Sequence, residues 1–178
     1  MAIIDPVPIE EIEGSDLAPL LEKARALHVP DDQFLQILAH APGYAKANFD
    51  AFYESHANGN VDHGLKEIIR IRLARLAGDD GYFGAMRSAR ATEAGLTEER
   101  IEAGCGDFET DPQFSDAEKW ALRYAAWMYT TPYKVDKAFY DEGKRFYSEA
   151  QIMELGAFIA FHYGIQTFFA TLKLTPKD

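Results

Sequence analysis

The stretch LARLAGDDGYFGAMRSARATEAGLTEERI, residues 73–101, decides the fold of this chain. It contains the end of one helix, a glycine-containing break and two further helix starts, and no run in it alternates apolar and polar residues as a strand would. The pattern predicts one helix that stops at Gly78, a second from about Gly81 to Glu93, and a short third helix that starts at Thr97. Short helices separated by breaks of this kind are typical of a helical bundle.

The rest of the chain carries the same helical pattern. Upstream, Asp31 and Asp62 are placed to cap helices. Downstream, two segments begin with a capping box, Ser115 to Glu118 and Ser148 to Gln151, in which a hydroxyl and the side chain three residues later bond free backbone N–H groups. We therefore predict an all-α fold, a helical bundle of about eight helices.

The length and composition fit one globular domain. The chain has 178 residues, of which 47% are hydrophobic and 26% charged, so it can bury most of the surface that its unfolded form exposes. We expect a single domain over residues 1–178. Residues 1–29 would form an N-terminal extension with a helix, and residues 30–172 the helical core.

The charge of the chain argues against nucleic acid and anionic membranes as partners. The formal net charge is -11, which repels phosphate groups unless basic residues are concentrated in one place. The only candidate patch contains three arginines and is offset by three nearby acids: Arg70, Arg72, Arg75, Glu67, Asp79 and Asp80. We interpret it as a solvated helix face with ion pairs.

Residues 155–172, LGAFIAFHYGIQTFFATL, contain no charged residue and approach the length that spans a membrane. They also include His162 and Gln166, and no aromatic and basic anchors flank them. The pattern favours a helix buried at the centre of the bundle. The N-terminus has no basic region followed by an apolar run, so we expect no signal peptide and a cytoplasmic protein.

Four segments of the chain carry a resemblance to a known family. LKEIIRIRLARLAG (65–78), EAGLTEERI (93–101), FSDAEKWALRYAAWM (114–128) and FYSEAQIMELGAFIAFHYG (146–164) resemble the alkylhydroperoxidase D-like and carboxymuconolactone decarboxylase family. The resemblance covers most of residues 30–172. It implies an all-helical domain and a homo-oligomer, a trimer or larger.

The peroxidase branch of that family carries a Cys-x-x-Cys pair just after LARLAG, and this chain lacks it. Counting back from Gly95 places the pair at Asp80 and Phe83, whereas counting forward from Glu67 places it at Asp79 and Tyr82. A thiol peroxidase cycle needs an attacking thiolate and a resolving thiol. The one cysteine, Cys105, has no partner, so the sequence disfavours peroxidase activity by that route.

Two residues of the opening stretch are candidates for binding a substrate. Arg87 stands where much of the family has a histidine, and it could hold the carboxylate of an acidic substrate through two hydrogen bonds or form an ion pair with Glu67 or an aspartate. Asp80, or Asp79, could lie close to substrate or could simply cap the helix that we expect from Gly81. Capping would lower the pKa of the aspartate, because N–H bonds and the helix dipole stabilise its charge.

Three further residues are candidates for catalysis. Glu67 corresponds to a glutamate of the proton relay in the peroxidase branch, but its spacing also permits an ion pair with Arg70. The phenol of Tyr82 could donate a hydrogen bond to a developing oxyanion, or its ring could belong to the core. His162 shares a helix face with apolar residues, so it is either a core histidine or the best general acid or base in the chain.

These residues support two hypotheses about function. In the first, the protein is a carboxymuconolactone decarboxylase-like enzyme without redox cysteines, a lyase acting on a small organic acid or lactone. Arg87 would hold the carboxylate, His162 or Glu67 would move the proton, and Tyr82 would stabilise an enolate-like intermediate. In the second, it is a non-catalytic ligand-binding or assembly protein. The histidines show no metal-ligand spacing, so we expect no metal site and no cofactor.

Overall fold

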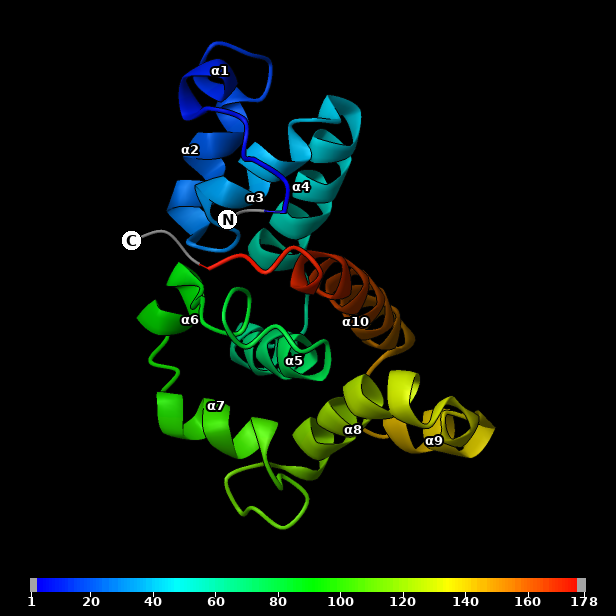
Figure 1. The fold of residues 1–178 in the computed structure, drawn as a ribbon. Helices are drawn as coiled ribbons and strands as arrows, with labels where there is room; N and C mark the ends of the chain where they lie inside the picture. Colours follow the sequence, from blue (N-terminus) through cyan, green and yellow to red (C-terminus); the bar gives the residue numbers. More distant parts are fainter. Residues whose placement is uncertain (1–2, 176–178) are drawn as a thin grey trace.

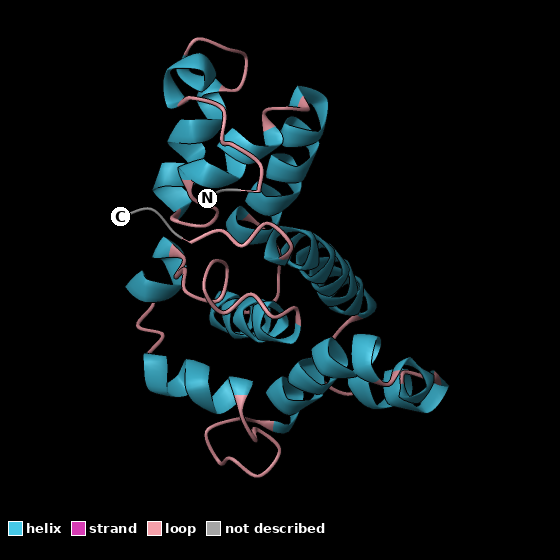
Figure 2. Ribbon diagram, in the orientation of Figure 1, coloured by secondary structure: helices cyan, strands magenta, loops and turns pink. Residues whose placement is uncertain are grey.

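The computed structural model describes residues 3–175. All regular secondary structure within them is helical, and they contain no strand. Figure 1 shows the order of the helices, and Figure 2 shows that loops alone connect them. The elements are α1 (Ile9–Glu13), α2 (Ala18–Leu27), α3 (Asp32–Leu38), α4 (Pro42–Ala57), α5 (His63–Leu76), α6 (Ala89–Glu93), α7 (Glu98–Cys105), α8 (Asp116–Thr130), the 3-10 helix η1 (Pro132–Lys134), α9 (Lys137–Gly143) and α10 (Glu149–Ala170). The predicted all-α fold class is confirmed.

The first four helices enclose one part of the hydrophobic core, which we call the N-terminal core. In Figure 1 these helices form the upper part of the molecule, and the end of α10 reaches them from below. Phe34, Phe49 and Phe52 are buried here together with Phe83 and with Phe169 of α10. The extension expected over residues 1–29 contributes two helices, α1 and α2, and their apolar residues belong to this core.

The later helices enclose a second part, the C-terminal core. It contains apolar residues of α5, α7, α8 and α9 and of the first half of α10. Trp120 is fully buried, and its indole N–H donates to the backbone oxygen of Phe139 at 3.0 Å. These helices form the lower part of the molecule in Figure 1.

Helices α5 and α10 join the two cores. They make the most extensive helix–helix contact of the described chain, and α10 contributes Ile159 to the C-terminal core and Ile165 to the N-terminal core. His162 lies between these two residues and is fully buried, as is Gln166. The prediction of a long helix over residues 155–172 is confirmed by α10, but the expectation that it is buried at the centre of the bundle is right for one face only. Its other face is exposed at Ala157, Ala160, Gly164, Thr167 and Phe168. No helix in the described part of the chain is long and apolar enough to cross a membrane.

The helix starts follow the predicted capping pattern. Asp31, Asp62 and Thr97 each accept a backbone N–H at the start of α3, α5 and α7. Both capping boxes are present, at Ser115 and at Ser148. These boundaries were predictable because the capping residue and its partner lie within four positions of each other.

The helix expected from about Gly81 to Glu93 is wrong for its first half. Residues 79–88 form a sequence of turns, and only Ala89–Glu93 is helical. The carboxylate of Asp79 accepts the N–H groups of Tyr82 and Phe83 at 3.2 and 3.3 Å, so these backbone groups are satisfied without a helix. Gly84 packs against this turn so closely that a Cβ atom would lie 2.8 Å from the backbone oxygen of Asp79.

Candidate functional site

Three histidines from three helices converge at the junction of the two cores. His56 comes from the end of α4, His63 from the start of α5 and His162 from the middle of α10. The ring centroids of His56 and His63 are 5.4 Å apart, and those of His56 and His162 are 5.6 Å apart. All three side chains are buried. We call these residues the histidine cluster.

The cluster contains buried ring nitrogens without hydrogen-bond partners. Neither nitrogen of His56 has one, and the Nδ1 atoms of His63 and His162 have none. The remaining two nitrogens each contact a hydroxyl, since His63 Nε2 lies 3.1 Å from Ser88 Oγ and His162 Nε2 lies 3.2 Å from Ser55 Oγ. Buried polar groups are nearly always paired because an unpaired one costs stability, so this cluster is a candidate functional site.

Burial keeps the histidines neutral. It lowers the pKa of His56 to about 3 and that of His63 to about 4, with smaller contributions from the charges around them. The pKa of His162 lies well below its usual value, again because of burial and then because of His56 and the nearby cations. A neutral imidazole has one nitrogen that donates and one that accepts, but a ring whose pKa is lowered in this way accepts a proton less readily than an ordinary histidine.

A cavity of about 350 Å³ opens beside the cluster, between α4 and α10. We call it the α4–α10 pocket. Its lining includes Ala51, Ser55, Ala157, Phe158 and Phe161, and it is mainly apolar. Ser55 both lines the pocket and contacts His162, so it connects the pocket with the histidine cluster.

One cation and two carboxylates lie at the wall of this pocket. Lys66 is almost completely buried, and its ammonium donates to Glu154 Oε1 at 3.0 Å and to the backbone oxygens of Ser55 and Asn58, each at 3.0 Å. Glu54 is the second carboxylate in the lining. The charged groups of the pocket therefore sum to about one negative charge, with the positive one next to Ser55.

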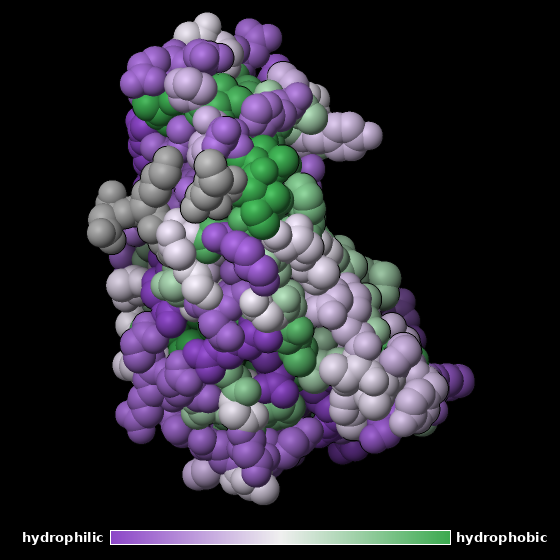
Figure 3. All heavy atoms as spheres, in the orientation of Figure 1, coloured by the Kyte–Doolittle hydropathy of each residue, from purple (hydrophilic) through white to green (hydrophobic). Residues whose placement is uncertain are grey.

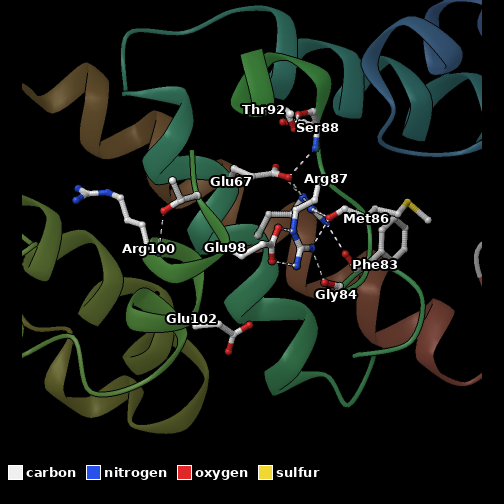
Figure 4. Close-up of polar contacts among 12 residues, drawn as sticks. Glu67, Phe83, Gly84, Met86, Arg87, Ser88, Thr92, Glu98, Arg100 and Glu102 are labelled. Carbon is white, nitrogen blue, oxygen red and sulfur yellow. Dashed lines mark hydrogen bonds and ion pairs between the residues drawn. The ribbon is translucent and has the colours of Figure 1, made fainter. Parts of the chain in front are cut away.

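Glu67 and Arg70 form a fully buried ion pair on α5. Arg70 donates to both carboxylate oxygens, at 3.0 and 2.8 Å, and to the backbone oxygens of Phe83 and Met86. Glu67 also accepts the N–H of Ser88 at 2.8 Å (Figure 4). These hydrogen bonds to Phe83, Met86 and Ser88 hold the 79–88 segment against α5. The expectation that the arginines of α5 form a solvated face is wrong for Arg70, because its guanidinium satisfies buried carbonyl groups.

This pairing determines the protonation of Glu67. Burial opposes ionisation, but the charge and hydrogen bonds of Arg70 outweigh burial and lower the pKa of Glu67 to about 2. A carboxylate with so low a pKa is a poor proton acceptor near neutral pH. Glu67 is linked to the histidine cluster through Ser88, whose N–H it accepts and whose hydroxyl contacts His63.

Arg87 lies apart from the histidine cluster. It forms a two-point ion pair with Glu98 of α7, at 2.7 and 2.9 Å, and donates to the backbone oxygens of Gly84 and Met86 (Figure 4). The structure therefore pairs Arg87 with Glu98 rather than with Glu67 or an aspartate. Its Nε and Nη2 groups hold the carboxylate of Glu98, and its Nη1 group holds two backbone oxygens.

Tyr82 and the two aspartates lie at the turn after α5. The ring of Tyr82 is buried in the N-terminal core, and its hydroxyl donates to Asp31. Burial, followed by the charge of Asp31, raises the pKa of Tyr82 well above its usual value. Asp79 is buried in the turn, whereas the side chain of Asp80 is 75% exposed and lies 3.8 Å from Arg75.

The expected direction of the Asp79 pKa is wrong. We expected a lowered pKa from a helix N-terminus, but the segment is a turn, and burial raises the pKa of Asp79 although the N–H groups of Phe83 and Tyr82 oppose this. The structure thus brings only His162 and, through Ser88, Glu67 into the cluster. Arg87, Tyr82 and Asp80 contact other parts of the chain.

Sequence reasoning did not identify Ser55, His56 and His63. The spacing of the histidines in the sequence shows no ligand motif that would single them out. Within residues 3–175 no group of three or more His, Cys, Asp or Glu is arranged to hold a metal ion. No periodic pattern links residues on α4, α5 and α10, so no local signal could have found the cluster. Cys105 lies elsewhere, at the end of α7, and burial raises the pKa of its thiol.

The fold is shared with several solved structures. The debrominase Bmp8 matches with a TM-score of 0.79 and 22% identity, over 98% of this chain and 92% of its own. A cysteine-to-alanine variant of Bmp8 in complex with 2,3,4-tribromopyrrole matches with the same TM-score and identity, over 98% of this chain and 91% of its own. An uncharacterized peroxidase-related protein with an alkylhydroperoxidase AhpD core, from Ralstonia eutropha JMP134, matches with a TM-score of 0.76 and 14% identity, over 99% and 93%.

No protein-family model and no curated protein matches the sequence. The solved structures nevertheless agree with one another, and they include a second peroxidase-related protein, from Silicibacter sp. TM1040, with a TM-score of 0.71 and 11% identity over 97% of this chain and 87% of its own. The chain therefore has the alkylhydroperoxidase D-like fold, which confirms the predicted resemblance at the level of the fold.

Proposed function

We propose that this protein is a non-redox enzyme of the alkylhydroperoxidase D-like fold, a lyase of the decarboxylase type that acts on a small organic acid or lactone. Substrate would bind in the α4–α10 pocket, and His162 would move the proton. Two observations argue against a thiol route: no second cysteine accompanies Cys105, and the pKa of its thiol is raised.

The contact between Ser55 and His162 carries this proposal. It joins a neutral imidazole of the cluster to a residue in the lining of the α4–α10 pocket. A proton taken from substrate would pass through the Ser55 hydroxyl to His162 Nε2. The ring centroid of His56 lies 5.6 Å from that of His162, but neither nitrogen of His56 has a hydrogen-bond partner, so the proton would stay on His162.

The charges of the pocket favour a neutral lactone or a singly charged acid. Glu54 and Glu154 repel additional carboxylates, and Lys66 attracts one. Because the N–H groups of Lys66 already bond Glu154 and two backbone oxygens, a neutral lactone fits the pocket better than an acid, with its hydrocarbon part against Phe158 and Phe161. Arg87, proposed from the sequence as the carboxylate ligand, would have to leave Glu98 to bind substrate.

The test incubates the protein with a panel of small lactones and organic acids. NMR spectroscopy measures the loss of each compound, and a gas assay measures the carbon dioxide released. We expect at least one compound to be consumed, and we expect His162→Gln to lower kcat about 100-fold, since general acid–base groups contribute 10² to 10⁴. Arg87→Ala should retain wild-type turnover, because its side chain does not reach the pocket. If no compound is consumed, or if His162→Gln is as active as wild type, the proposal is wrong.

A second function is favoured by a different observation. Two of the charged candidates, Glu67 and Arg87, are completely engaged in ion pairs with Arg70 and Glu98, as expected of a structural framework. A non-catalytic ligand-binding protein would use the α4–α10 pocket without a proton step. Such a protein would bind members of the same panel without consuming them, and His162→Gln would change affinity alone.

A further inference from the structure

We infer that Ser55 is a nucleophile, that His162 is its base, and that the α4–α10 pocket therefore supports acyl transfer from small neutral esters and lactones to water. The inference shares this pocket with the proposed function but does not depend on the lyase reaction. It adds a covalent step, and it specifies that the substrate has an ester carbonyl group.

The position of Ser55 differs from that of every other serine in the chain. Ser15, Ser88, Ser115 and Ser148 each accept a backbone N–H in a turn or at a helix start, from Leu17, Ala91, Glu118 and Gln151 respectively. Ser55 lies in the last turn of α4, lines the pocket and is half-buried. Its hydroxyl donates its single proton to the backbone oxygen of Phe52 at 2.8 Å and lies 3.2 Å from His162 Nε2, so the proton has to rotate from Phe52 to Nε2 before His162 can act as the base.

Aromatic packing holds the imidazole of His162 against this hydroxyl. The ring centroids of Phe52, Phe158 and Phe161 lie 4.9, 4.2 and 5.2 Å from that of His162. A nucleophile needs its base within hydrogen-bond distance and in a fixed orientation. In many serine enzymes a carboxylate orients the histidine, whereas here three aromatic rings do so.

Lys66 supplies positive charge where the reacting carbonyl oxygen would become an anion. Its three N–H groups donate to the backbone oxygens of Ser55 and Asn58 and to Glu154, each at 3.0 Å, so the ammonium is held beside the serine and acts on the oxyanion through its charge alone. A fixed cation in a poorly hydrated site stabilises an oxyanion. The apolar lining formed by Ala51, Ala157, Phe158 and Phe161 fits the hydrocarbon part of an ester.

The reaction proceeds in two balanced steps. First, Ser55 Oγ bonds to the carbonyl carbon while its proton passes to His162 Nε2; the C–O bond of the ester then breaks, and the leaving oxygen takes that proton. Second, water attacks the acyl-serine and gives a proton to Nε2; the acyl–Oγ bond breaks, and the proton returns to Ser55. The net reaction of a lactone is addition of water to give a hydroxy acid.

The experiment uses a fluorophosphonate, which forms a P–O bond with an activated serine and releases fluoride. Intact-mass measurement of the full-length protein should show one adduct, and peptide mapping should place it on Ser55. Ser55→Ala should lose the adduct, His162→Gln should slow its formation about 100-fold, and the matched control Ser148→Ala should label like wild type. The rate of p-nitrophenyl acetate hydrolysis should be equal in wild type and Ser148→Ala, lower in His162→Gln and absent in Ser55→Ala.

Several outcomes would overturn the inference: no adduct, an adduct on another residue, or an unchanged labelling rate in Ser55→Ala. Mapping the adduct on the wild-type chain keeps the inference testable even if Ser55→Ala does not fold. The two proposals fail separately. Lyase turnover by a wild-type protein that is not labelled contradicts only the nucleophile, and labelling of Ser55 without any lyase turnover contradicts only the proposed function.

Discussion

His56 is fully buried, yet neither ring nitrogen has a hydrogen-bond partner. Retaining such a side chain costs stability, because the imidazole gives up its bonds to water and gains none in the folded protein. Leucine has a similar volume and no polar atom. The position is therefore expected to be more stable with leucine than with histidine.

We predict that His56→Leu leaves the free energy of unfolding unchanged or raises it by about 1 kcal/mol. Urea denaturation followed by circular dichroism measures this difference. His63→Leu is the comparison, since it also removes the contact with Ser88, which caps α6. That variant should be less stable than wild type. A loss of several kcal/mol in His56→Leu would mean that the imidazole has a stabilising partner.

The two glutamate–arginine pairs near the 79–88 segment differ in burial. Glu67 and Arg70 are both 0% exposed, whereas the side chain of Glu98 is 65% exposed and that of Arg87 is 26% exposed. Removing one partner of a buried pair leaves an uncompensated charge, and this costs about 3 to 5 kcal/mol. Removing a surface pair costs about 0 to 1 kcal/mol.

We therefore predict that Glu67→Gln is strongly destabilised and that Glu98→Gln is nearly as stable as wild type. Thermal unfolding of both variants checks this prediction. The buried pair also holds the backbone oxygens of Phe83 and Met86 through Arg70, so Glu67→Gln should increase hydrogen exchange in residues 79–88. Equal stability of the two variants would contradict the assignment of Glu67 as a structural ion.

At the scale of elements, the loop between α4 and α5 sets one edge of the α4–α10 pocket. Gly59 has a φ of +105°, a backbone angle that residues other than glycine rarely adopt. A Cβ atom at this position would lie 2.1 Å from Glu154 Oε1. Glu154 accepts the N–H groups of Asn60 and Val61 as well as the ammonium of Lys66. A side chain at Gly59 would therefore displace the carboxylate that connects this loop to α10.

Gly59→Ala should lower the free energy of unfolding by about 1 to 3 kcal/mol, the cost of a strained backbone position, and should shift the Lys66 signals in NMR spectra. The matched control is Gly164→Ala in α10, where a Cβ atom meets nothing within 4 Å. Alanine is favoured over glycine inside a helix by about 1 kcal/mol. The control should be as stable as wild type or more stable, and the opposite order of the two variants would contradict this account of the loop.

At the scale of the whole molecule, the histidine cluster makes stability depend on pH. The folded-state pKa of His56 is about 3 and that of His63 about 4, against 6.5 for an unperturbed histidine, and that of His162 lies well below 6.5. Unfolding below pH 6.5 therefore takes up a proton at each ring. The stability of the neutral cluster is fully present above pH 6.5 and is lost as the pH falls toward 4.

We predict that the free energy of unfolding falls by up to about 4 kcal/mol per pH unit between pH 6 and 4, since each proton contributes about 1.4 kcal/mol per unit. Asp79 opposes this trend because its pKa is raised in the folded state. Urea denaturation at a series of pH values measures the slope. His56→Leu should reduce the slope by about one proton, and an unchanged slope would show that His56 is already charged in the folded protein.

We also propose that the protein is a homo-oligomer, as its resemblance to the alkylhydroperoxidase D-like proteins implies. Ile3, Ile4 and Phe168 are 59%, 42% and 48% exposed and line one apolar surface hollow together with Leu38 and Leu172. Green areas on the face shown in Figure 3 mark hydrophobic residues that remain at the surface. We predict that the wild-type protein has a molecular mass above that of a monomer and that Phe168→Asp lowers this mass. Light scattering measures both masses. A monomeric wild type would contradict this proposal.

The sequence by itself determined most of the helices and their capped starts, the long apolar helix α10, and the absence of a paired thiol. These features depend on residues three or four positions apart or on composition, so they can be predicted from short segments of the sequence. Only the tertiary structure decided that His56, His63 and His162 meet, that Arg87 pairs with Glu98, and that residues 79–88 form turns. The reason is physical: burial and pairing depend on which distant helices pack together, and no local spacing encodes the neighbours that desolvate a side chain.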